Sequence, residues 1–264
     1  MTIHHMSGAG NRFLMVDDRE LHCFDDVMTP DQVSDLFAKN ARPDAAPFEG
    51  LLRMRQIDGA QCVTDFYNPD GSRGMLCGNG ARCAVRYAID HGASAHSTLS
   101  CLFNGTSYTA RLYHDSTIGI MLPTPAQVRY FPIGTLENVQ IPVWYVDVRS
   151  DHVVIEAPRD DANPIVSILR HHADFPRGVN VNMLERISPD IARLATFERG
   201  VEAITQACGT GAVSTAVTLW MRDPSITRFT IVPPSGRELV VTIFADAGHI
   251  DSIELRGDAV YDNT

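Results

Sequence analysis

One five-residue pattern occurs twice in this chain and constrains its fold more than any other feature. The stretches Cys77-Gly-Asn-Gly-Ala81 and Cys208-Gly-Thr-Gly-Ala212 share the sequence Cys-Gly-x-Gly-Ala. Each copy directly precedes a segment with apolar residues at helical spacing, so each cysteine is predicted to stand at the N-terminus of a helix. A motif repeated in the same local context indicates two related halves, each with its own helix.

A cysteine at the start of a helix has a definite chemical use. The first turn leaves backbone N–H groups unpaired, the helix dipole is positive there, and glycine lets a ligand approach the backbone closely. Such an end binds a carboxylate and lowers the pKa of a nearby thiol from about 8.5 toward neutrality. Two such ends facing one carbon could take a proton from one side and deliver one to the other. We therefore expect Cys77 and Cys208 to form an acid–base pair.

The alternative interpretation is that the cysteines are small buried apolar residues, as most cysteines are. Core positions rarely lie inside Gly-x-Gly loops at helix starts, so this alternative is assigned to the other four, which are Cys23, Cys62, Cys83 and Cys101. None of the six cysteines forms a Cys-x-x-Cys pair, and no histidine follows at zinc-finger spacing. The spacing therefore favours neither a structural metal nor a thiol redox protein.

The composition excludes several other classes of protein. The chain has 264 residues, is 44% apolar and 20% charged, and carries a formal net charge of −10. That apolar fraction predicts a globular protein, and the negative charge makes it a poor binder of nucleic-acid backbones. No apolar run approaches the roughly 20 residues that span a bilayer, and no signal-peptide pattern is seen. The expected location is the cytoplasm.

The pattern of predicted elements mixes helices and strands. Thr29, Pro30 and Gln32 form a capping box that predicts a helix to Lys39. An Asp58-Gly59 turn predicts a hairpin between two strands at 51–56 and 61–67. Further helices are predicted at 78–90, 163–173, 189–195 and 209–221, and further strands at 12–17, 99–103, 107–113, 117–122, 143–148, 153–156, 237–244 and 250–255.

Pro123 and Pro125 interrupt this pattern near the middle of the chain and predict a domain boundary. The expected domains are residues 1–122, which carry Cys77, and residues 123–264, which carry Cys208. The last residues of the chain are expected to be free to pack back onto the N-terminal domain.

Longer stretches around the two motifs resemble the diaminopimelate epimerases. Residues 68–83, which read Asn-Pro-Asp-Gly-Ser-Arg-Gly-Met-Leu-Cys-Gly-Asn-Gly-Ala-Arg-Cys, are similar to the first signature of that family, and residues 207–212 are similar to the second. Residues 6–11, 175–182 and 197–200 are similar to three further motifs, and all the matching stretches stand in the family's order. The chain is identified as a member of this cofactor-independent racemase and epimerase superfamily.

The resemblance implies a fold and a reaction. The fold is α+β, with two similar domains, each a curled antiparallel sheet around a central helix, and an active site in the cleft between them. The implied reaction interconverts LL- and meso-diaminopimelate through Cys77 and Cys208, for lysine and peptidoglycan precursors. No pyridoxal phosphate, other cofactor or metal is implied. The expected partners are a small amino-acid substrate and a second copy of the chain, with no nucleic acid and no membrane.

The resemblance also implies roles for the residues around the thiols. Backbone amides that would hold the carboxylate of the reacting centre belong to Gly78, Asn79, Gly209 and Thr210. Asn11 would contact the substrate near that centre, and Glu198 and His152 would lie beside the thiols or the substrate amines. The distal amino-acid end would be held by Asn68, Ser150, Asn180 and Arg199.

Three of these roles have a structural alternative. Asn68 could be only a turn residue, Arg199 a surface ion pair, and His152 a buried structural histidine. Asn182 is expected to be structural.

Three departures from the family pattern leave the substrate open. Arg12 follows Asn11 where members usually have Asp after the Asn, and Ile204 stands where a Glu is common before the Thr. Ser150-Asp151 replaces the usual Asn-Pro before His152, and a serine has one donor where an asparagine has two. The alternatives are another amino-acid racemase of the superfamily, for example one acting on histidine, and a non-catalytic amino-acid-binding homologue.

Overall fold

The chain forms two compact units. The computed structural model describes residues 2–20, 23–24, 26–74, 76–94, 98–160 and 163–262. Met1–Met121 and Arg256–Thr264 make up unit 1, and Leu122–Leu255 make up unit 2. The chain leaves unit 1 just before Pro123, and its end returns there as strand β17 (Val260–Tyr261), which pairs antiparallel with β1 (Thr2–Gly8).

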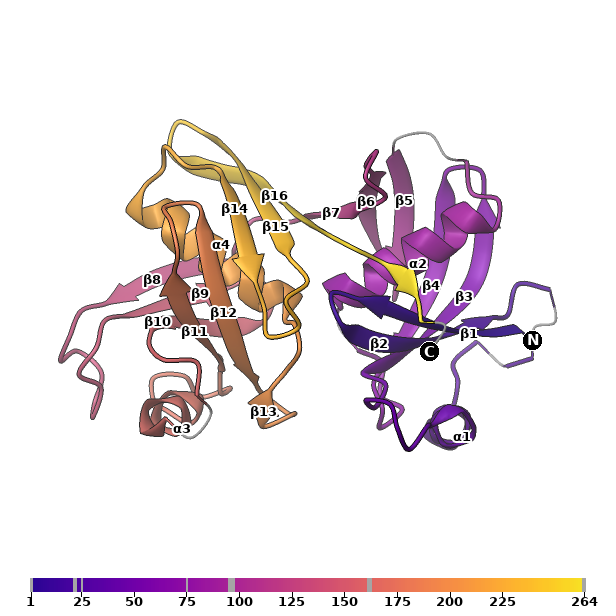
Figure 1. Cartoon of the computed structure of the whole chain (residues 1–264), viewed down its shortest axis with the longest axis horizontal. Helices are drawn as coiled ribbons and strands as arrows, with labels where there is room; N and C mark the ends of the chain where they lie inside the picture. Colours follow the sequence, from indigo (N-terminus) through magenta and orange to yellow (C-terminus); the bar gives the residue numbers. More distant parts are fainter. Residues whose placement is uncertain are drawn as a thin grey trace. The chain divides into compact units, whose positions relative to one another are not determined.

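Unit 1 is a mixed sheet around one central helix, α2, which lies across the strands in Figure 1. Two of its strand pairs, β2–β3 and β4–β5, are parallel, while β1–β2, β3–β4, β5–β6 and β6–β7 are antiparallel. Parallel neighbours require a crossover connection, and helices α1 and α2 lie in the two crossovers. The elements are β1, β2 (Asn11–Asp17), α1 (Pro30–Asn40), β3 (Gly50–Asp58), β4 (Gln61–Tyr67), α2 (Gly78–Asp90), β5 (Thr98–Phe103), β6 (Thr106–Leu112), β7 (Ile118–Leu122) and β17.

Unit 2 has the same plan around helix α4. Strands β10–β11 and β12–β14 are parallel, with α3 and α4 in their crossovers, and β8–β9, β9–β10, β11–β12, β12–β13 and β14–β15 are antiparallel. The elements are β8 (Gln127–Phe131), β9 (Val143–Asp147), β10 (Asp151–Glu156), α3 (Pro164–Arg170), β11 (Asn180–Arg186), β12 (Ile191–Glu198), β13 (Ala203–Ile204), α4 (Gly209–Arg222), β14 (Arg228–Val232), β15 (Leu239–Asp246) and β16 (His249–Gly257).

The two units repeat one order of pairings along the chain. From β1 to β6 and from β9 to β15, omitting the short β13, successive pairs run antiparallel, parallel, antiparallel, parallel, antiparallel. The helix that begins after the repeated Cys-Gly motif lies in the second crossover of each unit. The α+β class with two similar halves is therefore confirmed. The sheets are mixed, not purely antiparallel, because each unit contains two helical crossovers.

Local signals explain most of the elements. The capping box of α1 is confirmed, since the Thr29 hydroxyl accepts from the Gln32 amide at 3.3 Å and the Gln32 side chain accepts from the Thr29 amide at 2.9 Å. The hairpin at Asp58-Gly59 is confirmed as β3 and β4, and Gly59 takes the positive φ of 52° that the turn needs.

The helix predicted at 189–195 is wrong. Those residues enter strand β12, which pairs with β11 from Val181↔Phe197 to Arg186↔Ala192. Pro189-Asp190 resembles a helix start, but the ladder to β11 satisfies the backbone and overrides that local preference. Strand β1 was not predicted, because its His4-His5 pair breaks the apolar alternation.

Candidate active site

The start of α2 presents the first thiol of the repeated motif. Cys77 is the N-cap residue, and its sulfur accepts a hydrogen bond from the Gly80 amide at 3.5 Å. The thiol is half-buried, while Gly78 and Asn79 behind it are buried. The structure therefore brings Cys77, Gly78 and Asn79 together at one helix end, as the motif predicts.

A buried arginine supports this helix end from one turn further along. Arg82 is fully buried, and its Nη2 donates to Asn79 Oδ1 at 2.8 Å while its Nε donates to the Asp258 carbonyl at 3.1 Å. Burial lowers the pKa of Arg82, but an arginine keeps its proton, and its charge interacts with the Cys77 thiol. The returning C-terminal segment thus helps to hold the first helix start.

Asn11 and Asn68, the other two predicted site residues of unit 1, form hydrogen bonds with other residues of that unit. Asn11 is buried and its amide nitrogen donates to the Glu49 carboxylate. Asn68 Nδ2 donates to Ser72 Oγ at 2.9 Å, and the Asn68 amide donates to the Ser72 carbonyl at 2.8 Å. The side chain of Asn68 therefore stabilises its own turn, which is the structural alternative that the sequence left open.

The start of α4 presents the second thiol with the same cap. Cys208 is the N-cap residue, and its sulfur accepts from the Gly211 amide at 3.4 Å and lies 3.5 Å from Thr210 Oγ1. Glycine is required at 211, because a Cβ there would lie 2.5 Å from Asn182 Oδ1 and 2.6 Å from Thr196 Oγ1. The helix end is therefore packed closely against β11 and β12.

The pKa of Cys208 corrects one expectation. Burial raises this pKa well above its ordinary value, and the nearby Glu198 carboxylate raises it further. The Gly211 amide and the Thr210 hydroxyl act in the opposite direction, as expected for a helix N-terminus, but they do not outweigh burial. Cys208 is therefore a neutral thiol, which donates a hydrogen bond to Glu198.

Glu198 lies at the end of β12 and is also shifted by its surroundings. Burial raises the pKa of this carboxyl, and hydrogen bonds from Thr205 and Cys208 offset part of the effect. The carboxyl and the Cys208 thiol, whose pKa values are both raised, are joined by the second of these hydrogen bonds. Glu198 therefore lies beside the Cys208 thiol.

His152 lies behind α4 in a chain of hydrogen bonds. Its Nδ1 lies 3.0 Å from Asn182 Nδ2, which also donates to the Val153 carbonyl at 2.9 Å, so Nδ1 must be the acceptor. The proton is therefore on Nε2, which donates to Thr210 Oγ1 at 2.9 Å. Burial lowers the pKa of His152 to about 3, so the ring stays neutral.

Asn182 and Thr196 complete this chain and were missed as site residues. Thr196 Oγ1 donates to Asn182 Oδ1 at 2.8 Å, which fixes the amide that orients His152. Both side chains are buried and belong to adjacent strands. Their polar side chains at core positions were the only signal in the sequence.

Of the four residues predicted to hold a distal group, Ser150, Asn180 and Arg199 lie together in unit 2, and Asn68 lies in unit 1. Asn180 Nδ2 donates to Ser150 Oγ at 3.1 Å and to the Asp151 carbonyl at 2.9 Å, while its Oδ1 accepts from the Arg199 amide at 2.9 Å. The Asn180 amide is therefore fully used in holding Ser150 and Arg199. Asp151, which the sequence marked only as a departure, ion-pairs with Arg177 at 2.6 Å and with Arg199 at 3.5 Å.

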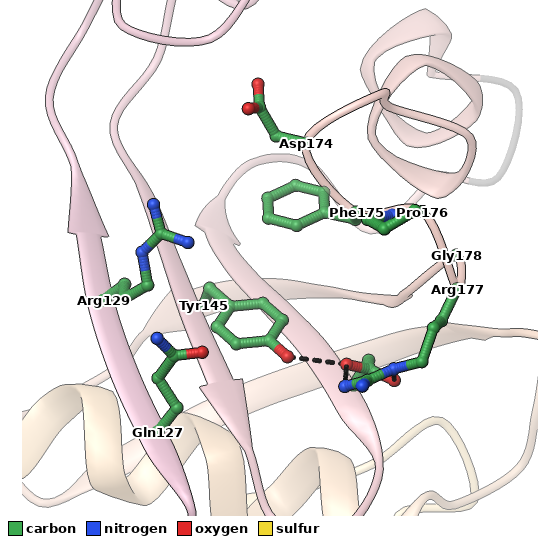
Figure 2. Close-up of a pocket in the computed structure, with 9 residues that line it drawn as sticks. Gln127, Arg129, Tyr145, Asp174, Phe175, Pro176, Arg177 and Gly178 are labelled. Atoms are coloured by element: carbon green, nitrogen blue, oxygen red, sulfur yellow. Dashed lines mark hydrogen bonds and ion pairs between the residues drawn. The ribbon is translucent and has the colours of Figure 1, made fainter.

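Next to this group is a pocket of about 160 Å³, drawn in Figure 2. Side chains on β10 alternate between the two faces of the sheet, so Asp151 faces the pocket while His152 faces α4. Its lining residues are Gln127, Arg129, Tyr145, Asp151, Asp174, Phe175, Pro176, Arg177 and Gly178.

Over the ranges that the structure describes, no group of three or more His, Cys, Asp or Glu side chains is arranged to hold a metal ion. Within those same ranges, no helix has the length and apolar character that crossing a membrane requires.

The family model described as diaminopimelate epimerase matches residues 3–128. The diaminopimelate epimerase of Chlorobaculum tepidum is 32% identical over 220 residues, which cover 80% of this chain and 80% of that protein. The diaminopimelate epimerase of Xanthomonas euvesicatoria pv. vesicatoria is 30% identical over 97% of this chain and 92% of its own length.

Solved structures share the fold at much lower identity. A PhzF-family phenazine biosynthesis protein of Bacillus anthracis matches with a TM-score of 0.73 and 13% identity, covering 98% of this chain and 96% of that one. A hydroxyproline epimerase of Agrobacterium vitis, solved with bound trans-4-hydroxy-L-proline, matches with a TM-score of 0.65 and 13% identity, covering 99% and 90%.

Proposed function

Because the chain belongs to the diaminopimelate epimerase family, we propose that it interconverts LL- and meso-2,6-diaminopimelate by proton transfer between Cys77 and Cys208. The observation that carries the proposal is the repeated helix start. In each unit a cysteine caps the helix of the second crossover and points its sulfur at the amide three residues on. Two equivalent thiols fit a reaction that handles one proton on each side of one carbon.

The proposed reaction has two steps and balances without a cofactor. The thiolate of one cysteine removes the α-proton, and the electron pair of the C–H bond passes to the carbon and its carboxylate. The thiol of the other cysteine then delivers its proton to the opposite face, so that one thiolate is consumed and one is formed. Amides of the two helix starts, at Gly78, Asn79, Gly209 and Thr210, would stabilise the charge on the carboxylate.

The surroundings of the two sulfurs support different roles for the two cysteines in the resting enzyme, one as the acid and one as the base. Cys208 is held as a neutral thiol by burial and by Glu198, so it would be the proton donor. Cys77 is half-exposed at its helix start, so it would be the base. The epimer whose α-hydrogen faces Cys77 would then react with this resting form.

The second amino-acid head of the substrate would be held in unit 2. Arg199 would pair with its carboxylate, Asn180 and Ser150 would shape the surroundings, and Asn68 would contribute from unit 1. Asn11 would contact the substrate near the reacting centre instead. We further propose that the protein is a cytoplasmic homodimer. Its reaction would supply precursors of lysine and peptidoglycan. Ser150 favours the second candidate, a racemase of the same superfamily for another amino acid such as histidine, because it offers one donor where an asparagine offers two.

Exchange of the α-hydrogen in heavy water tests the chemistry and the substrate together. The enzyme is incubated separately with LL-diaminopimelate, meso-diaminopimelate, histidine and glutamate, and deuterium uptake and stereochemistry are followed by mass spectrometry and chiral chromatography. The expected result is exchange and interconversion of the two diaminopimelate isomers alone. Exchange of histidine with inert diaminopimelate would favour the second candidate, and binding without any exchange would favour a non-catalytic homologue.

A further inference from the structure

Asp151 is the centre of a charged cluster in unit 2. Tyr145 donates its hydroxyl to Asp151 Oδ1 at 2.6 Å, and Arg177 grips both carboxylate oxygens, with Nη2–Oδ1 at 2.6 Å and Nε–Oδ2 at 3.0 Å. Figure 2 shows Tyr145 and Arg177 converging on this one carboxylate. The Asp151 side chain is 10% exposed, so these bonds are largely shielded from water.

The same residue also reaches Arg199 by two routes. Its carboxylate Oδ2 lies 3.5 Å from Arg199 Nη1, and its carbonyl accepts from Asn180 Nδ2 at 2.9 Å. Asn180 in turn accepts from the Arg199 amide at 2.9 Å. Asp151 therefore restrains both the backbone and the guanidinium of Arg199.

The contacts that restrain the Arg199 guanidinium all involve its Nη1 atom. Arg199 Nη1 donates to the carbonyls of Arg177 at 2.7 Å and Gly178 at 3.1 Å in addition to its contact with Asp151. In the part of the chain that the structure describes, Nε and Nη2 of Arg199 have no protein partner. That open edge presents two parallel N–H groups, which is the geometry that binds a carboxylate bidentately.

The charge balance leaves Arg199 able to attract an anion. Although burial acts to raise the pKa of Asp151, hydrogen bonds from Arg177 and Tyr145 hold it below its ordinary value, so the group is ionised. Its bidentate partner is Arg177, which neutralises most of its charge. Arg199 is therefore anchored by Asp151 without being neutralised by it.

We propose that Asp151 is a positioning residue that holds Arg199 with its Nε–Nη2 edge open to the second carboxylate of an amino-acid substrate with two carboxylates. The proposal rests on the proposed function and adds to it a device absent from the family pattern, which usually has proline at this position. Here a rigid backbone residue is replaced by a side chain that organises the recognition group electrostatically.

The test separates binding from catalysis with a matched pair of variants. Asp151→Asn keeps the shape and removes the charge, while Asp147→Asn removes the other carboxylate near Arg177, which lies 3.7 Å from its Nη2. Deuterium exchange gives kcat and KM for meso-diaminopimelate, and calorimetry gives its Kd. Asp151→Asn is expected to raise KM and Kd about tenfold and to change kcat less than about twofold, and Asp147→Asn is expected to change neither.

Other outcomes have definite meanings. An unchanged KM and Kd in Asp151→Asn, or an equal rise in Asp147→Asn, would overturn the positioning role while leaving the epimerase proposal intact. A wild-type enzyme with no exchange would overturn the proposed function, and the Kd comparison would still decide the role of Asp151. If Asp151→Asn does not fold, Tyr145→Phe releases one carboxylate oxygen, and it is expected to raise KM by a smaller factor, about threefold. No rise there would overturn the proposal.

Discussion

The starts of α2 and α4 have the same backbone geometry and different surroundings. Both cysteines are extended caps, with φ and ψ of −97° and 107° at Cys77 and −113° and 112° at Cys208. The Arg82 guanidinium is buried within the first helix, and the Glu198 carboxyl forms a hydrogen bond with the thiol at the second. A repeated local motif has therefore produced equivalent backbone geometry in two different surroundings.

The different surroundings of the two cysteines suit a reaction that needs an acid and a base at the same time. Two identical thiols that hold one proton between them would carry it with equal probability, so neither would be the preferred acid. A half-exposed sulfur at one helix start and a buried thiol beside a carboxyl at the other give the two cysteines different surroundings. The comparison thus predicts that the two cysteines are both essential and chemically distinct.

The largest expected effect comes from removing either thiol. Cys77→Ala and Cys208→Ala are each expected to lower the rate of epimerisation by about 10³-fold or more, because each variant lacks one of the two proton carriers. The rates are measured by chiral chromatography of diaminopimelate. Cys83→Ala is the matched control, since Cys83 is fully buried within α2, and it should retain activity within a few fold. If Cys83→Ala is as inactive as Cys77→Ala, the assignment of the pair is wrong.

A smaller effect is expected in thiol reactivity, which measures the difference between the two helix starts directly. Iodoacetamide at pH 8 should modify Cys77 at least about tenfold faster than Cys208, because Cys208 is buried and its pKa is raised. Peptide mapping by mass spectrometry gives the two rates. Glu198→Gln removes the carboxylate beside Cys208 and should therefore reduce the ratio of the Cys77 rate to the Cys208 rate. Glu202→Gln changes an exposed carboxyl and should leave this ratio unchanged. Equal rates in the wild type would show that the surroundings do not distinguish the thiols.

The smallest expected effect is on stability and concerns the neutral histidine behind α4. The pKa of His152 falls from 6.5 to about 3 on folding because the ring is buried. Between these values the unfolded chain binds a proton that the folded chain does not, so stability is lost as the pH falls from about 6.5. The contribution is about 1 kcal/mol between pH 6.5 and 5.5.

Urea denaturation at these two pH values checks this contribution. His152→Gln should remove about 1 kcal/mol of the pH-dependent change, whatever its effect on the absolute stability. His249→Gln replaces an exposed histidine, and the difference in unfolding free energy between the two pH values should remain that of the wild type. If the pH-dependent difference in unfolding free energy is the same in His152→Gln as in the wild type, the ring is protonated in the folded protein.

Much of the site follows from short-range patterns in the sequence. The Cys-Gly-x-Gly motif and the apolar periodicity after it predict both helix starts, and both cysteines cap their helices as expected. The capping box at Thr29 and the turn at Gly59 are likewise formed. These features depend on backbone dihedral preferences and hydrogen bonds within a few residues, so the local sequence is sufficient to specify them.

The tertiary structure decided what depends on partners far away in the chain. Residues 191–198 form a strand because β11 supplies a ladder, although the local sequence favours a helix. The raised pKa of Cys208 requires burial under the sheet and the approach of Glu198, and the anchoring of Arg199 requires Asp151, which is 48 positions earlier. Desolvation and charge pairing are properties of an assembled environment, so no local pattern encodes them. The sequence by itself determined which groups stand at the two helix starts, and only the packed structure determined their protonation and their neighbours.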